Sequence, residues 1–487
     1  MAEQKPHFLL VTYPVQGHIN PALQFAKRLL RAGARVTFST TVSAYRKMEK
    51  GNSIPKGVTF TTFSDGYDDG YRRNVDGDGQ TYLSVFRQRG SESLRELLKK
   101  SAAEGNPVTC LVYTLLLPWA AEVARGLNVP SALLWIQPAT VFDVYYYYFN
   151  EYNDVISECE KDPSWCLKLP NLPFELKARD LPSFLLPSNS YSYTCALLPS
   201  FKEQMEELEK EEKATILVNT FEALEADMLR SIEKFQLIPI GPLLPSAFLD
   251  GKDPLDKSFG GDLFQRSKDG DYMEWLNSQE KSSVIYVSFG SLSVLSKPQM
   301  EELARALIQT RRPFLWVIRE KETKEKEKQD QETKQAEEEE EELSCMGELK
   351  QQGLIVPWCS QVEVLSHPSI GCFVTHCGWN STLESLTSGV PMVAFPQWTD
   401  QTTNAKLVQD VWKTGVRVKP SEEDGLVKSE ELGRCLEVVM ESDETKENAK
   451  RWRDLAIQAS FSKPFNPKNE YGQFKNRRST KLKGAAN

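Results

Sequence analysis

Apolar runs and amphipathic stretches alternate along the first half of the chain. Residues 8–12 form an apolar run that predicts a buried strand, and residues 13–18 follow as a polar loop. Asn20 is a typical helix N-cap and Pro21 a typical first helical residue, so we expect a helix from there to Gly33. Strands that alternate with helices indicate a parallel sheet covered on both faces. The further strands expected in this half are 35–38, 108–112, 131–135 and 215–219.

The pattern breaks at residues 241–245 and resumes after residue 270. Between 245 and 270, Gly, Asp, Ser and Lys dominate without periodicity, which predicts an interdomain linker. A second α/β series follows, with a helix at 297–309 and strands at 283–288, 314–318, 354–356, 372–375 and 391–394. We therefore expect two doubly wound, Rossmann-like α/β domains, 1–244 and 271–455, facing a cleft. Ligands in such folds bind at the carboxyl ends of the strands.

Composition and charge narrow the class of protein. The 487 residues are 40% hydrophobic and carry a net charge of −9, which excludes a wholly disordered chain and gives no reason to expect nucleic acid. Residues 320–342 hold twelve acidic and five basic side chains and predict a low-complexity insert, whereas residues 456–487 form an atypical basic tail. The absence of a signal pattern and of a long apolar run predicts a cytoplasmic protein without membrane insertion.

The nine cysteines lie mostly in apolar runs and form no C-x-x-C pair. Buried, reduced thiols fit this distribution. Cys372 and Cys377 flank His376 but lack a second pair of ligands, and the Asp-Gly-Asp triplets at 76–78 and 269–271 lie in turn-rich stretches. We therefore expect no bound metal.

Candidate chemistry is densest between residues 358 and 401. A strand at 373–375, a turn with glycine and a helix from about Ser381 present backbone N–H groups that suit a phosphate. A nucleotide site is the simplest interpretation. Its residues are Trp358 for a base, Glu384 for ribose hydroxyls, and His376, Asn380 and Ser381 around the anion.

Purely structural roles remain open for several of these residues. Ser381 and Glu384 have the spacing of a capping box, in which the carboxylate satisfies the helix instead of a ribose. Trp379 and Trp398 could be core aromatics, and Asp400 a turn residue.

The joint spacing carries a family resemblance. The segment starts with W-C-S-Q at 358–361, has H-C-G-W-N-S at 376–381 and ends with D-Q at 400–401, a box of 44 residues. It resembles the donor-binding signature of plant family 1 UDP-glycosyltransferases. The resemblance extends to Gly17–Pro21, to residues 288–291 and to the two-domain order, and implies a GT-B fold. Residues 63–70 resemble the subgroup of anthocyanin 5-O-glucosyltransferases and glucose-ester-forming enzymes.

The resemblance implies a role for each donor-site residue. Trp358 would stack on uracil, while the Cys359 backbone pairs with its edge. Gln401 at the end of the box is associated with glucose donors, so UDP-glucose is the expected co-substrate, without a metal. The other implied roles are ribose binding by Gln361 and Glu384, diphosphate binding by Ser291, His376, Asn380 and Ser381, and binding of sugar hydroxyls by Trp379, Asp400 and Gln401.

His18 is the candidate catalytic residue of the first half. It is expected in a loop after a strand, just before a helix, where it could also simply cap that helix. The resemblance makes His18 the general base of an inverting transfer to a small plant acceptor. The family usually has an Asp at the position of Thr114. A hydroxyl orients an imidazole but does not stabilise imidazolium as a carboxylate does, which favours acidic acceptors.

The acceptor site is less well marked. Gln137 and Tyr145 are expected near it, although Tyr145 could belong to a packed helix. The expected function is transfer of glucose, by a monomer, to a hydroxyl or carboxyl group of a small plant secondary metabolite. The acceptor classes expected are flavonoids or anthocyanins, phenolics, and apocarotenoid or terpenoid acids. A non-catalytic nucleotide-sugar-binding protein and a transferase using another UDP-sugar are the alternatives. A nicotinamide dehydrogenase is disfavoured because the first β–α turn lacks G-x-G-x-x-G.

Overall fold

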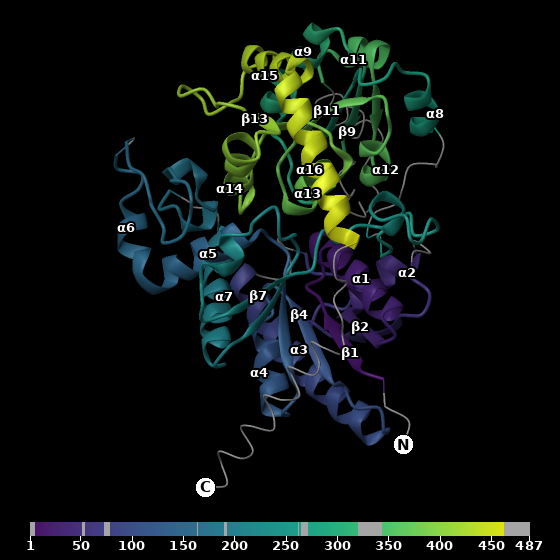
Figure 1. The fold of residues 1–487 in the computed structure, drawn as a ribbon, viewed down its shortest axis with the longest axis vertical. Coiled ribbons are helices and arrows are strands. Elements are labelled where there is room, and N and C mark those ends of the chain that lie inside the picture. Colours follow the sequence, from purple (N-terminus) through teal and green to yellow (C-terminus); the bar gives the residue numbers. More distant parts are fainter. Residues whose placement is uncertain are drawn as a thin grey trace, which may run out of the picture. The chain divides into compact units, whose positions relative to one another are not determined.

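The computed structural model describes residues 5–50, 54–72, 78–162, 164–188, 192–261, 263, 271–319 and 343–461. It forms two units, Met1–Phe264 together with the chain from Ala456 onward, and Gln265–Leu455 (Figure 1). The insert 320–342 and the tail beyond residue 461 lie outside the described residues. No helix in the described ranges has the length and apolar character needed to cross a bilayer.

The first unit is built on a seven-stranded parallel sheet with the order β3-β2-β1-β4-β5-β6-β7. Its central strands are near-continuous apolar runs, as expected for strands covered on both faces. The strands are β1 (His7–Val11), β2 (Arg35–Thr41), β3 (Thr59–Phe63), β4 (Cys110–Thr114), β5 (Ser131–Trp135), β6 (Thr215–Val218) and β7 (Gln236–Pro239). The helices are α1 (Gln16–Arg31), α2 (Val42–Lys50), α3 (Gly79–Ala103), α4 (Pro118–Gly126), α5 (Ala139–Tyr147), α6 (Asn153–Ser157) and α7 (Ser192–Glu209).

The second unit repeats this topology with six parallel strands in the order β10-β9-β8-β11-β12-β13. Helices α9 and α15 pack side by side on one face of the sheet, where Leu307 and Leu436 join its core (Figure 1). The strands are β8 (Val284–Ser288), β9 (Phe314–Val317), β10 (Leu354–Val356), β11 (Ile370–Thr375), β12 (Met392–Ala394) and β13 (Gly415–Arg417). The helices are α8 (Asp271–Asn277), α9 (Lys297–Thr310), α11 (Met346–Gln352), α12 (Gln361–Leu365), α13 (Trp379–Ser388), α14 (Gln401–Lys406), α15 (Ser429–Glu441) and α16 (Asp443–Phe461).

Both sheets reverse their strand order at one point, between β1 and β4 in the first unit and between β8 and β11 in the second. At such a point the loops leave the carboxyl ends of two adjacent strands in opposite directions, which opens a crevice for ligands. The expected pair of doubly wound α/β domains, the GT-B architecture, is confirmed.

Helix α1 begins earlier than the sequence predicts. It starts at Gln16 with Val15 as its N-cap, so Pro21 lies inside the helix and His18 in its first turn, not in a preceding loop. Asn20, the predicted cap, instead accepts a hydrogen bond of 2.5 Å from the Gln16 amide. The same Gln16 side chain donates to the Gly261 carbonyl and accepts from the Leu263 N–H. Contacts with a segment distant in sequence therefore support this first turn.

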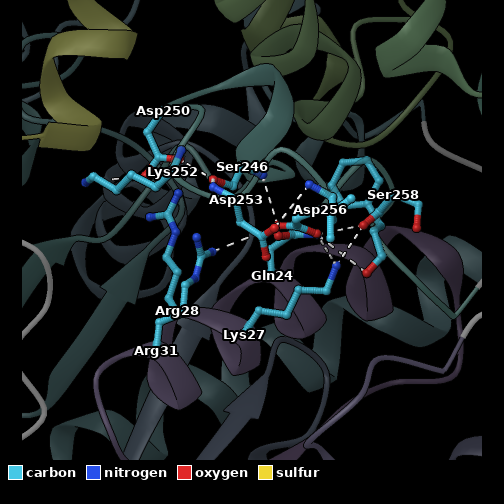
Figure 2. A network of polar contacts seen from close by, with 12 residues as sticks. Gln24, Lys27, Arg28, Arg31, Ser246, Asp250, Lys252, Asp253, Asp256 and Ser258 are labelled. Carbon is cyan, nitrogen blue, oxygen red and sulfur yellow. Dashed lines mark hydrogen bonds and ion pairs between the residues drawn. The ribbon is translucent and has the colours of Figure 1, made fainter.

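The segment 245–261, predicted as part of a free linker, belongs to the first unit and is fastened along α1 (Figure 2). Lys27 donates to Asp256 at 2.6 Å and to the Ser258 carbonyl at 2.7 Å. Just before this segment, Arg28 donates to the carbonyls of Ile240 and Pro242. Burial lowers the pKa of Arg28 to about 10. The boundary between the units falls after residue 264, within the predicted linker 245–270.

Helix α16 continues to Phe461, so residues 456–461, the first of the predicted tail, are helical. The Ser460 carbonyl accepts a hydrogen bond of 3.4 Å from Lys252, and the Lys252 ammonium lies 4.9 Å from the centre of the Phe461 ring. The last turn of α16 is thus attached to the same segment that is fastened to α1.

Candidate active site

In the second unit, the turn between β11 and α13 carries the central part of the 44-residue box. Cys377 adopts a left-handed conformation with φ of 61°, which is uncommon for a residue with a Cβ atom. Helix α13 then begins at Trp379 with Gly378 as its N-cap, two residues before the predicted start. Ser381 is therefore inside the helix, and no side chain caps it. The capping-box interpretation of Ser381 and Glu384 is wrong.

His376 lies at the end of β11 and is buried against backbone. A Cβ atom on Gly290 would lie 2.6 Å from the His376 ring, and one on Gly378 would also overlap it, so only glycine fits at both positions. The Nδ1 atom of His376 has no hydrogen-bond partner in the described part of the chain. Burial, and to a smaller extent the charge of Arg319, lowers the pKa of His376 to about 4. The ring is therefore neutral at physiological pH.

Gln361 and Glu384 form a buried polar cluster. The Gln361 amide donates to Glu384 Oε2 at 2.7 Å and to Ser381 Oγ at 2.8 Å, and its oxygen accepts from the Tyr286 hydroxyl at 3.3 Å. Tyr286 also lies 3.4 Å from the Cys359 sulfur. Burial raises the pKa of Glu384 to about 7, although the Gln361 hydrogen bond acts in the opposite direction. Additional hydrogen-bond donors to Glu384 would therefore stabilise its charged form.

The end of the box forms a second loop, after β12. The Gln401 side-chain oxygen accepts from the backbone N–H groups of Gln397 and Trp398, at 2.9 and 3.1 Å. Thr399, between Trp398 and Asp400, has a positive φ of 58°. The Trp398 indole donates to Ser293 Oγ at 3.2 Å. Asp400 and Gln401 are both buried, and the loop around them is held by its own side chains.

The remaining donor-site candidates differ in exposure. Trp379 is 3% exposed and lies 6.0 Å from Trp412, ring centre to ring centre, so it packs as a core aromatic whatever else it contacts. Trp358, Asn380 and Ser291 are half-buried. Arg319 donates to the carbonyls of Ser291 and Ser293, which holds the loop after β8 in place.

In the first unit, the turn after β1 and the end of β4 bring His18 and Thr114 together. His18 Nδ1 lies 3.0 Å from Thr114 Oγ1, which also accepts a hydrogen bond from the Tyr13 N–H at 3.1 Å. The ring thus bonds Thr114 and does not cap α1. Burial lowers the pKa of His18 to about 3. Such an imidazole is neutral at physiological pH and a weak base.

The two acceptor-site candidates lie at different depths. Gln137, directly after β5, is 9% exposed, and its side-chain oxygen has no partner among the described residues. Tyr145 is fully buried and stacks on Phe201 with ring centres 4.4 Å apart. Tyr145 therefore lies in the aromatic core of the first unit, and its hydroxyl is buried with it.

Comparisons with known proteins point in one direction. Residues 252–464 match the family model described as UDP-glucoronosyl and UDP-glucosyl transferase. A crocetin glucosyltransferase of Gardenia jasminoides is 59% identical over 462 residues, covering 94% of each chain. An anthocyanidin 3-O-glucoside 5-O-glucosyltransferase of Perilla frutescens is 54% identical over 459 residues, covering 93% of this chain and 98% of the relative.

The chain is a plant family 1 UDP-glycosyltransferase. The rice protein Os79, solved in complex with UDP, superimposes with a TM-score of 0.79 at 33% identity and covers 96% of this chain and 99% of its own. The expected likeness to the anthocyanin 5-O-glucosyltransferase subgroup is confirmed by the Perilla relative.

Several polar residues that contact the site were not predicted from the sequence: Tyr286 bonds Gln361, Arg319 bonds the Ser291 carbonyl, and Asn404 bonds Asp400. Asn404 lies on α14, one turn after Asp400, and its Nδ2 atom donates to the Cys377 carbonyl and to Asp400 Oδ2, both at 2.8 Å. Only this helical spacing could have suggested it. Within the described ranges, no three His, Cys, Asp or Glu side chains come together as metal ligands.

Proposed function

We propose that this enzyme transfers glucose from UDP-glucose to a phenolic hydroxyl or a carboxyl group of a small plant metabolite, with inversion at the anomeric carbon. The second unit would bind the donor and the first unit the acceptor. The observation that carries the proposal is the 44-residue box, in which five polar side chains after β11 and β12 are buried: His376, Ser381, Glu384, Asp400 and Gln401. Such preorganised donors stabilise developing charge without reorganising during the reaction.

The donor would occupy the loops after β8, β10, β11 and β12. Trp358 and the Cys359 backbone would hold uracil, and Gln361 and Glu384 the ribose. A ribose hydroxyl that donates to Glu384 would lower the pKa of its carboxyl from about 7 and favour the charged form. Ser291, His376, Asn380 and Ser381 would contact the diphosphate, and Trp379, Asp400 and Gln401 the sugar.

His18 would act as the general base. The Nδ1–H group would donate to Thr114, which leaves Nε2 free to take the acceptor's proton. The acceptor oxygen would then bond to the anomeric carbon, while the bond from that carbon to the diphosphate oxygen breaks and UDP leaves with the electron pair. A positioned base contributes about 10²–10⁴-fold to the rate.

Acidic acceptors fit this base best. The pKa of His18 is about 3, and Thr114 provides no negative charge to raise it. A carboxylate needs no base, and a phenol needs less help than an alcohol. Crocetin is a dicarboxylic acid and anthocyanidin glucosides are phenols, so the names of both relatives agree with this preference.

The test is product formation from UDP-glucose with a panel of carboxylic acids, phenols and alcohols, alongside His18→Ala. We expect turnover of acids and phenols, confirmed by mass, and its loss on phenols in the variant. Binding of UDP-glucose without any product would favour the non-catalytic binding protein. Faster turnover with UDP-galactose or UDP-xylose would make another sugar the donor.

Three further expectations belong to this proposal. The leaving diphosphate would be held by fixed protein donors, so activity should persist in excess chelator. Size-exclusion chromatography with light scattering should give the mass of a monomer, 55.3 kDa. A cytoplasmic location stays a prediction, and the name of the Gardenia relative includes the word chloroplastic.

A further inference from the structure

We infer that Asn404 is a positioning residue that aims the Asp400 carboxylate at the donor sugar and ties it to the turn after β11. The inference rests on the proposed function, because it takes Asp400 as a sugar contact. Asn404 is fully buried, and α14, which carries it, packs against α13 (Figure 1). It lies outside the 44-residue box, which ends at Gln401.

The orientation of the Asn404 amide is determined by its two acceptors. Its Nδ2 atom has two hydrogens, and the Cys377 carbonyl and Asp400 Oδ2 take one each. An amide turned the other way would place its oxygen against two acceptor oxygens. The Asn404 Oδ1 atom has no hydrogen-bond partner in the described part of the chain, so the side chain acts there as a hydrogen-bond donor.

These hydrogen bonds hold the two loops at backbone positions that are hard to maintain otherwise. Cys377 and Thr399 both have positive φ, at 61° and 58°, and neither is glycine. Asn404 donates to the carbonyl of Cys377 and to the carboxylate of Asp400, the residue after Thr399. Thr399 Oγ1 donates to Asp400 Oδ1, and Asn404 donates to Asp400 Oδ2, so the two hydrogen bonds together orient the carboxylate.

The experiment compares Asn404→Ala with Asp400→Asn and wild type in donor discrimination. UDP-glucose and its C4 epimer UDP-galactose differ in one hydroxyl, and kcat/KM is measured for each below the unfolding temperature of every variant. We expect Asn404→Ala to lower kcat/KM for UDP-glucose at least about tenfold and to narrow the glucose-to-galactose ratio, as misplacement of a contact group does. Asn404→Ser, which keeps one donor, should fall between Ala and wild type, and replaces Ala if that variant does not fold.

Gln352→Ala is the matched control. The Gln352 amide nitrogen also bridges two oxygens, the carbonyls of Leu307 and Arg312 at 2.8 Å each, but near the amino ends of β9 and β10. Gln352→Ala should lower the melting temperature and leave the ratio of kcat/KM for UDP-glucose to that for UDP-galactose unchanged. A purely structural Asn404 would behave in the same way, and that result would overturn the inference. If Asp400→Asn also keeps the wild-type ratio, the sugar contact itself is wrong, and the inference fails with it.

Discussion

Each unit of this molecule carries one buried histidine at the point where its strand order reverses, yet the two rings have different surroundings. His18 follows β1, and Thr114 at the end of the adjacent β4 lies 3.0 Å from its Nδ1. His376 follows β11, and the adjacent β8 leads to Gly290, which lies against the ring without bonding it. Burial lowers both pKa values, to about 3 and about 4.

Because both rings are buried, burial does not distinguish them. What differs between His18 and His376 is the hydrogen bond at Nδ1. The Thr114 hydroxyl can hold His18 Nδ1 in either tautomer, and it holds the ring in one orientation. His376 has no such partner among the described residues, and its ring fills the space that a Cβ atom would need at Gly290 and Gly378. Under the proposed function, His18 would accept a proton and His376 would contact the diphosphate.

Matched substitutions of the two histidines give the largest expected effect. His18→Gln should lower turnover of a phenol by about 10²–10⁴-fold, because the proton acceptor is lost. UDP affinity, measured by calorimetry, should stay at the wild-type value. His376→Gln should instead weaken UDP binding. If both variants lose turnover and neither loses UDP affinity, the two rings do not have separate roles.

The second prediction concerns stability in acid. A histidine whose pKa is lower in the folded than in the unfolded state stabilises the fold above its ordinary pKa of 6.5, and this stability is lost as the pH falls below 6.5 towards the folded value. Each buried ring should therefore cost about 2 kcal/mol of stability between pH 7 and pH 5.

Melting temperatures at pH 7 and pH 5 test this for His18→Gln and His376→Gln. Both variants should lose less stability than wild type on acidification. His367→Gln is the control. That ring is only half-buried, so it should contribute less to the loss of stability between pH 7 and pH 5. If only one of His18→Gln and His376→Gln reduces the loss of stability between pH 7 and pH 5, the two rings do not share the same burial penalty.

The third prediction tests the space beside His376. Gly378 has an ordinary φ of −58°, so Gly378→Ala adds no backbone strain, and its Cβ atom would displace the His376 ring. We expect UDP to bind about tenfold more weakly. Gly433→Ala, where a Cβ meets nothing within 4 Å, is the control. Wild-type UDP affinity in Gly378→Ala would mean that the ring position is unimportant for the ligand.

The smallest expected effect is that of a charge beside His18. Thr114→Asp should raise the pKa of His18 and increase the rate with phenols a few-fold, without changing the rate with carboxylic acids, which need no base. Thr114→Asn keeps a similar shape without the charge and should not accelerate phenol transfer. Equal acceleration of both acceptor classes would argue against His18 acting as the base.

The sequence predicts the parts of this fold that depend on local pattern. The buried central strands and the strand–turn–helix of the box are as expected, because apolar runs and turn residues identify both. The short strands β3, β7 and β13 are missing from the prediction. They lie at or near the sheet edges and are only partly buried, so their residues lack a continuous apolar run.

The start of α1, the attached segment 245–261 and the bridge made by Asn404 could not be predicted, because each depends on contacts between distant residues. Gln16 bonds the Gly261 carbonyl, and Asn404 bonds Cys377, 27 positions earlier. Polar residues without periodicity indicate a loop but do not say what the loop binds. Thr114 is the opposite case, because the family resemblance already associated its position with His18.

The attachment of segment 245–261 to α1 has a practical consequence for making hybrid enzymes from two relatives. A crossover at residue 245 would pair Lys27 with a foreign segment and could leave Asp256 of the incoming chain without its partner on α1. Removing one partner of a buried ion pair costs about 3–5 kcal/mol. A crossover at 264–265 keeps α1 and its segment from the same parent, and α16 from Ala456 onward should come from that parent as well.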